Sequence, residues 1–437
     1  MRASPGRHRA TREVRPMARD TSTSRDQDPA ARDDRWRQWR PPARFGAGPW
    51  TPDATGITMV TLLLVVLGLV MSFSASFVDA AEAGNPFGVF TRQATWAVIG
   101  IIAFVVAASV DHRVWRRLSW GLLAISLVGL ILVLIDGIGL ERYGSTRWLG
   151  VGPLVVQPSE LAKLATLLWL ADVLERKRPK DRSLHDVDHL LLPALPLLAL
   201  LALLVLMQPD LGTTILLSLI VASILWVEGL PSRFVAILAM LGLLGVATLA
   251  VVAPYRLARV TGWLNPEADP LGGGFQLLQS RYALGSGGVF GVGLGSSRAK
   301  WNFVPNPETD FIFAIIGEEL GLVGATAVLA LFGALLYFGL RVAYAAGSGF
   351  ARTVAFAITA WLVGQAMINI GAVTGLLPIT GVTLPLVSVG GSSLVSTLAA
   401  LGILVAITRG SATVAPSPPR PGRRTARERP STGGSRS

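Results

Sequence analysis

The chain has no cysteine and only four histidines among its 437 residues. It therefore forms no disulfide, builds no zinc site from thiolates and uses no thiol nucleophile. Charged residues are also scarce, at 15%, whereas hydrophobic residues make up 51% of the chain. This balance is typical of a protein that crosses a lipid bilayer several times.

Strong positive charge is confined to the two ends of the chain. Residues 1–54 hold twelve Arg and seven acidic residues, residues 409–437 hold seven Arg and one acidic residue, and 55–408 is nearly balanced. Both ends lack hydrophobic periodicity, which predicts disordered basic tails suited to an anionic cytoplasmic leaflet. Their Arg residues form no nucleic-acid-binding motif and are not interleaved with aromatic residues, so we expect no nucleic-acid partner.

Between the tails, residues 55–408 contain ten apolar stretches, each near the roughly twenty residues that a bilayer-spanning helix needs. The first begins near Thr55, which is too late for a cleavable signal peptide. We predict an all-α polytopic membrane domain with about ten transmembrane helices and a large extracytoplasmic loop, 255–309, between helices 7 and 8. The predicted spans are 56–77, 93–110, 118–136, 158–175, 189–207, 211–228, 233–254, 311–341, 351–376 and 384–408.

The distribution of Lys and Arg predicts the orientation of these spans. With both termini inside, thirty of the 39 basic residues fall in the tails or in cytoplasmic loops, so the chain is predicted to be N-in and C-in. The histidines then all lie on the cytoplasmic side: His8, His112, His185 and His189. This excludes a Ser-His-Asp triad or a histidine metal site at the outer face.

Nine basic residues lie within the membrane or on the unfavoured side: Arg92, Arg142, Arg147, Lys163, Arg256, Arg259, Arg281, Arg298 and Lys300. Cations kept there indicate an anionic ligand, for which a diphosphate is a candidate. Contacts with lipid headgroups and ordinary salt bridges are equally open explanations.

Charged side chains also occur where the chain enters or crosses the membrane, and such groups are functional candidates because ionised groups are costly there. Glu160 and Lys163 share one helix face, so they either lock neighbouring helices together or line a polar cavity that opens outwards. Asp210 ends a tight polar turn, 208–210, where it either caps the turn or reaches an outer vestibule.

The segment 300–321, KWNFVPNPETDFIFAIIGEELG, joins the long polar loop to the eighth apolar stretch. Asp310 stands at the junction, where a carboxylate is partly dehydrated and fixed yet still meets water, which suits a general base. The alternative is that Asp310 caps the helix N-terminus, where its charge suits the helix dipole. Glu318 and Glu319 follow by about two turns, so one of them is expected beneath Asp310.

Four blocks of this sequence resemble the SEDS family of cell-wall polymerases, and the resemblance covers nearly all of 55–408. The blocks are GSTRWL at 144–149 with QPSELAK at 157–163, QPDLGT at 208–213, the segment 300–321, and the segment 369–393. The likeness is greatest to the septal, FtsW-type branch, through the long tails, 263–267 and 369–371. The chain departs from the family at Val389, where a small residue or Tyr usually precedes the double glycine, and we expect a change in local packing only.

The resemblance implies a glycosyltransferase that polymerises lipid II outside the membrane, beside a class B penicillin-binding protein that supplies transpeptidation. The proposed catalytic aspartate of the family falls on Asp310. This residue is then predicted to accept a proton from the acceptor sugar hydroxyl in a single inverting displacement, with a lipid diphosphate as leaving group. The developing charge needs cations or a metal, and a divalent ion, Mg²⁺ or Mn²⁺, stays open as a cofactor.

The candidate substrate-binding residues in this scheme come from the first three of the four blocks. They are Arg147, Gln157, Glu160, Lys163, Asp210, Lys300 and Glu319. The expected location is the bacterial cytoplasmic membrane at the division septum, among other divisome proteins and membrane lipids. An elongation role of the RodA type, a lipid II flippase, and a scaffold whose tails recruit division proteins stay open as alternatives.

Overall fold

The structure is a computed structural model that describes residues 48–82, 84–142, 145–151, 154–177, 187–252, 254–298 and 308–412. Most of the predicted N-terminal tail, 1–54, and of the C-terminal tail, 409–437, lies outside these ranges. The disorder predicted for both tails therefore stays a prediction.

Each of the ten predicted spans overlaps one long helix of the described chain. These helices are α2 (Pro52–Glu82), α3 (Gly88–Ser109), α4 (His112–Val133), α5 (Pro158–Lys177), α6 (Val187–Leu206), α7 (Leu211–Val227), α8 (Ser232–Val252), α11 (Ile312–Ala345), α12 (Gly349–Thr374) and α13 (Gly391–Ala412). Six of them contain segments long and apolar enough to cross a membrane: α2, α3, α4, α11, α12 and α13. The protein is thus a helical, multi-pass membrane protein, while the count of ten crossings stays a prediction.

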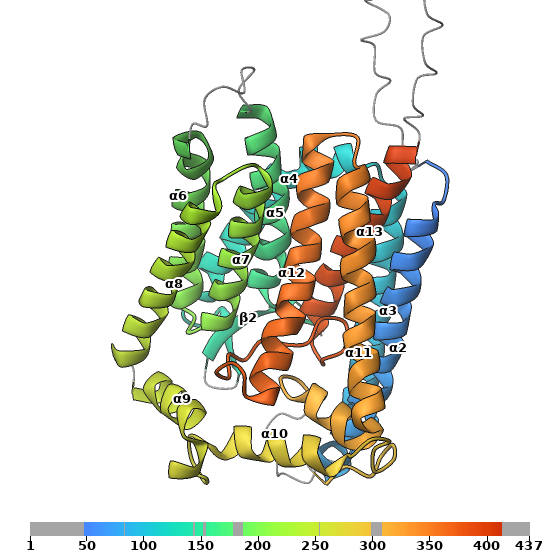
Figure 1. Ribbon diagram of the computed structural model, residues 1–437, viewed down its shortest axis with the longest axis vertical. Helices are drawn as coiled ribbons and strands as arrows, with labels where there is room; N and C mark the ends of the chain where they lie inside the picture. The colour runs from blue at the N-terminus through green and yellow to red at the C-terminus, as the bar shows by residue number, and fades with distance from the viewer. Residues whose placement is uncertain are drawn as a thin grey trace, which may run out of the picture. The chain divides into compact units, whose positions relative to one another are not determined.

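The beginning and the end of this bundle lie side by side. Figure 1 shows the start of α2 and the end of α13 at one end of the long helices, and Arg409 Nε donates a 2.9 Å hydrogen bond to the carbonyl of Gly48. The first and last long helices thus start and finish at the same end of the bundle, as the predicted N-in, C-in orientation requires. The opposite end carries the loop region between α8 and α11.

That loop region contains regular structure where the sequence analysis predicted a large polar loop. It forms α9 (Pro254–Leu264), a short 3-10 helix (Pro266–Ala268) and α10 (Phe275–Ser286). α10 packs against α11 and α12, so this part of the loop covers the end of the bundle.

A small antiparallel sheet follows α4 within this otherwise helical fold. Its strands, in spatial order, are β1 (Gly139–Arg142), β2 (Ser145–Val151) and β3 (Leu154–Val156). Leu149 in the central strand pairs with both edge strands, opposite Gly139 and Val156. Thr, Trp and Val residues in these strands favour extended backbone, and the sheet leads directly into α5.

The predicted tenth span, 384–408, is helical only from Gly391 onward. Residues 384–390 are apolar enough to resemble a helix, yet they form an irregular segment in which Leu386 has φ of 66°. Polar side chains satisfy its backbone: the Leu384 amide donates to Ser388 Oγ at 2.8 Å, and the Gly390 amide donates to Gln93 Oε1 at 3.3 Å. Irregular backbone is tolerated in a membrane protein where protein groups satisfy it in this way.

Helix α11 is broken at Gly321, which has φ of 66° and ψ of −161°. A glycine-rich loop, 287–293, enters the break and hydrogen-bonds on both sides of it. The bonds are Val292 N to Glu318 O at 2.9 Å, Gly293 N to Glu319 O at 3.1 Å, Leu322 N to Gly288 O at 2.9 Å and Val323 N to Val289 O at 3.1 Å. The break therefore divides α11 into a short first half, 312–320, and a long second half.

Candidate active site

Asp310 lies in a turn just before α11, and its side chain is partly exposed. Three hydrogen bonds from α12 and the irregular segment after it fix the turn's carbonyls. They are Asn369 Nδ2 to Asp310 O at 2.8 Å, Ser388 Oγ to Thr309 O at 2.6 Å and Val389 N to Glu308 O at 2.9 Å. The N-cap of α11 is Phe311, one residue later, so the predicted alternative of Asp310 as the N-cap is wrong.

The carboxylate of Asp310 faces the loop that follows α12. A Cβ atom added to Gly381 would lie 3.6 Å from Asp310 Oδ2, and Gly381 has φ of +71°. Only glycine adopts this backbone conformation easily, and because it has no Cβ atom it places no side chain next to the carboxylate. A partly exposed carboxylate on an anchored backbone has the position and access that a general base needs.

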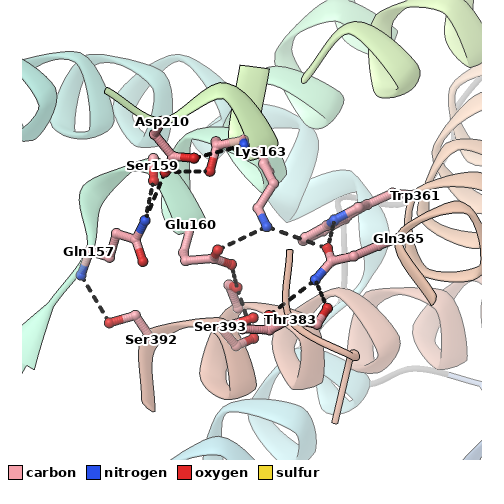
Figure 2. A network of polar contacts seen from close by, with 12 residues as sticks. Gln157, Ser159, Glu160, Lys163, Asp210, Trp361, Gln365, Thr383, Ser392 and Ser393 are labelled. Carbon is pink, nitrogen blue, oxygen red and sulfur yellow. Dashed lines mark hydrogen bonds and ion pairs between the residues drawn. The ribbon is translucent and has the colours of Figure 1, made fainter. Parts of the chain in front are cut away.

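A second cluster surrounds Lys163, which is completely buried in α5 (Figure 2). Its ammonium lies 2.9 Å from Glu160 Oε1, 3.5 Å from Gln365 Oε1 and 5.1 Å from the centre of the Trp361 ring. Ser396 in α13 donates to the other oxygen of Glu160 at 3.3 Å. The predicted Glu160–Lys163 pair is therefore present and joins three helices.

Asp210 is the centre of a third cluster, and both roles predicted for it are compatible with its contacts. It caps α7, because Oδ1 accepts a 3.0 Å hydrogen bond from the Thr213 amide. Its Oδ2 also lies 3.4 Å from Arg147 Nη1 in β2 and accepts a 3.3 Å hydrogen bond from Gln157 Nε2. The sheet thus brings a cation to the start of α7, and Gln157 connects this pair to the start of α5.

The three clusters are linked through short hydrogen-bonded paths. Gln365 of the Lys163 cluster donates from Nε2 to Thr383 O at 2.9 Å, and Asn369, which anchors the Asp310 turn, donates from Nδ2 to Val382 O at 2.7 Å. The two clusters are therefore linked through adjacent residues of the segment after α12. At the start of α13, Ser392 Oγ accepts from the Gln157 amide at 2.9 Å. Figure 2 shows the clusters around Lys163 and Asp210, whose labelled side chains converge from α5, the start of α7, α12 and the start of α13.

Two predicted site residues are not part of this network as described. Lys300 lies outside the described residues. Glu319 is 1% exposed, and its carboxylate accepts hydrogen bonds from Ser74 Oγ at 2.7 Å and from the Ser297 amide at 3.3 Å. A direct contact between Glu319 and substrate stays a prediction.

The sequence analysis did not assign a role to several polar residues that build the site: Gln93, Trp361, Gln365, Thr383 and Ser396. For Gln93, Gln365 and Ser396 the signal is a polar side chain inside an apolar stretch, which is costly in a membrane and therefore informative. Gln365 and Asn369 carry a further signal, because a spacing of four places them on one face of a helix.

The family profile described as "cell cycle protein", that of FtsW, RodA and SpoVE, matches residues 54–413. The chain belongs to the FtsW/RodA/SpoVE family. It is 44% identical over 361 residues to stage V sporulation protein E of Bacillus subtilis (strain 168), covering 82% of this chain and 97% of that protein. It is also 44% identical over 374 residues to the probable peptidoglycan glycosyltransferase FtsW of Mycobacterium tuberculosis (strain ATCC 25618 / H37Rv), covering 85% of this chain and 71% of the relative.

Solved structures agree with this membership. RodA of Thermus thermophilus matches with a TM-score of 0.59 and 30% identity over 81% of this chain and 96% of RodA. A chain of a peptidoglycan synthase complex matches with a TM-score of 0.67 and 34% identity, covering 82% of this chain and 98% of that one. The bundle described above is therefore the family's fold.

Proposed function

We propose that this protein is a peptidoglycan glycosyltransferase that polymerises lipid II at the outer face of the cytoplasmic membrane. The names of the FtsW relatives support this activity. The observation that carries the assignment of its base is the turn at Asp310, whose backbone is anchored by Asn369 while its carboxylate is partly exposed. Asp310 is the general base of the reaction.

In this reaction Asp310 accepts the proton of the acceptor hydroxyl as its oxygen bonds to the donor's anomeric carbon. The bond from that carbon to the lipid diphosphate breaks with inversion, and no protein nucleophile is needed. Arg147, Lys163 and Lys300 supply positive charge to the diphosphate. Asp210 holds Arg147 in place and Glu160 holds Lys163 in place. Gln157 orients Asp210.

A divalent cation also belongs to this proposal. Among the described residues, no group of three or more His, Cys, Asp or Glu side chains is placed to hold a metal. Mg²⁺ is often held by one or two carboxylates together with substrate phosphate oxygens, so such an ion would need few protein ligands. When bound, the ion would supply charge neutralisation for the diphosphate.

The test of the base is lipid II polymerisation by the purified protein, comparing wild type with Asp310→Asn. The substitution keeps size and polarity but removes the proton acceptor, so polymer formation should fall by at least about a hundredfold. Asp136→Asn is the matched control, because Asp136 is exposed beyond the end of α4 and should tolerate the change. Polymerisation by Asp310→Asn at the wild-type rate removes Asp310 from this role.

We also propose a class B penicillin-binding protein as partner and the division septum as location. The solved peptidoglycan synthase complex, in which polymerization and crosslinking are coordinated, supports a transpeptidase partner. Co-purification with the cognate transpeptidase and polymerisation with and without it test the pairing. Imaging of cells in which a tagged copy replaces the protein separates the septum from the elongating side wall, where a RodA-type role would place it.

Lipid II flipping is a second candidate, favoured by the buried Glu160–Lys163 pair inside the helix bundle. Charged residues in membrane interiors frequently line substrate paths. Flipping in liposomes by Asp310→Ala, with no polymerase activity in wild type, would establish it in place of polymerisation.

A further inference from the structure

Two adjacent carboxylates, Glu318 and Glu319, are buried at the break of α11. They are 2% and 1% exposed, deeper than Asp310 in the turn before the other end of this half-helix. Buried carboxylates are stable only when hydrogen bonds or charges compensate them. Their partners therefore show which parts of the fold depend on them.

Glu318 and Glu319 join three separate segments of the chain. Glu319 accepts a hydrogen bond from Ser74 Oγ of α2 at 2.7 Å. Ser297 donates its amide to Glu319 at 3.3 Å and its hydroxyl to Glu318, and the Arg298 amide donates to Glu318 at 2.9 Å. We call these contacts the carboxylate clasp; it ties α2 and residues 297–298, which follow the glycine-rich loop, to the first half of α11.

The clasp lies beside the break in α11, where the backbones of the glycine-rich loop and α11 approach too closely for a side chain to fit between them. A Cβ atom at Gly291 would lie 2.1 Å from Glu319 O, and one at Gly321 would lie 2.3 Å from the Gly291 amide nitrogen. The loop therefore fits into the break only as bare backbone. Together with the four backbone bonds across the break, the clasp fixes the direction in which the short half-helix leaves Gly321.

Asp310 lies in the turn that leads directly into the other end of this half-helix. The half-helix 312–320 is roughly 12 Å long. Asn369 and Ser388 anchor the Asp310 end, but a rigid segment needs anchors at both ends for its tilt to be defined. A tilt at the break would shift Asp310, and a misplacement of about 1 Å can cost roughly a hundredfold in rate.

We propose that Glu318 and Glu319 are positioning residues for the glycosyl transfer, which set the place of Asp310 by clasping its half-helix to Ser74 of α2 and to the loop at Ser297. The proposal rests on the proposed function. It gives Glu319 a role that acts through Asp310 rather than a contact with the lipid-linked substrate.

The experiment compares Ser74→Ala with Ser76→Ala in the full-length protein. Both serines are buried in α2, but Ser76 Oγ only donates to Ser72 O in its own helix, at 2.7 Å. Ser74→Ala should lower kcat for lipid II polymerisation by about tenfold or more and leave KM within about twofold. Ser76→Ala should match wild type, and Ser74→Thr, which keeps a hydroxyl, should recover most of the rate.

Amide hydrogen exchange gives a second readout that needs no substrate. Exchange in 287–298 should be faster in Ser74→Ala and Glu319→Gln than in wild type, because the clasp protects these amides. A raised KM with unchanged kcat in Glu319→Gln, or faster exchange with unchanged kcat, overturns the positioning role. A wild-type protein that makes no polymer overturns the proposed function, and the two failures are thereby distinguished.

Discussion

Gln365 and Asn369 lie one turn apart on α12 and hold the carbonyls of two adjacent residues, Thr383 and Val382. Through its other contacts Gln365 reaches Lys163, and Asn369 reaches the backbone of Asp310. One face of α12 therefore sets the spacing between the buried cation and the carboxylate that we assign as base. Four predictions test this arrangement and its surroundings.

Asn369→Leu should reduce both stability and turnover. It removes the donor to Asp310 O and Val382 O, and unsatisfied buried carbonyls cost about 1–3 kcal/mol. Because the Asp310 turn loses an anchor, kcat should also fall by about tenfold or more. Thr374→Val is the control, since the Thr374 hydroxyl bonds only to carbonyls of α12 itself. Thermal unfolding in detergent and polymerisation kinetics measure the two effects, and an unchanged kcat would contradict the anchoring role.

Glu160→Gln should destabilise the protein more than removal of both charges does. The single change leaves the buried Lys163 ammonium without its carboxylate, a loss of about 3–5 kcal/mol when a buried pair is broken. The double variant Glu160→Gln/Lys163→Met removes the stranded charge and should recover part of that loss. Denaturation midpoints of both variants measure this, and equal midpoints would show that the pair contributes nothing specific.

Gly381→Ala should lower kcat, whereas Gly84→Ala should not. Both glycines have left-handed φ, of +71° and +82°, so alanine costs each roughly 1 kcal/mol of strain. Only at Gly381 does the new methyl meet Asp310; nothing lies within 4 Å of the corresponding position at Gly84. Similar melting temperatures with different kcat values are expected. Equal kcat values would show that the methyl does not restrict the carboxylate.

Asp172→Asn should lower stability without changing the kinetics of the folded protein. Asp172 is completely buried and lies 2.5 Å from Arg116 Nε and 2.8 Å from Arg176 Nε. It is roughly 18 Å along α5 from Glu160, too far to touch the site. The loss should be about 1–3 kcal/mol, because Asp172 is buried but both Arg partners reach solvent and stay hydrated. A changed KM for lipid II would show that this end of the bundle also handles substrate.

Hydrophobic run length was enough to place each of the ten predicted spans on one long helix of the described chain, although only six of these helices contain a segment long and apolar enough to cross a membrane. The Glu160–Lys163 contact was equally accessible, since a spacing of three fixes it within one helix. The position of Asp310 at a helix entry followed from the change in polarity around it. Local pattern was sufficient wherever local geometry decides the outcome.

The break at Gly321 and the irregular segment 384–390 could not be predicted from local sequence pattern. A single glycine in an apolar run is usually tolerated within a helix. The break exists because a loop some thirty residues earlier supplies its hydrogen bonds, and the irregular segment exists because Gln93 and Ser388 satisfy its amides. These partners are remote in sequence or invisible to hydropathy. The short sheet was missed because strands of three to seven residues carry little pattern.

The hydrogen bond from Arg409 to Gly48 brings the two ends of the membrane domain close enough for circular permutation. The guanidinium also lies 5.2 Å from the centre of the Trp50 ring, so the residues before the first long helix contact the last long helix. A short peptide could therefore splice the last helix to the first, with new termini opened at an exposed turn such as the one around Gly137. Such a circular permutant would keep every contact of the site while dispensing with both basic tails.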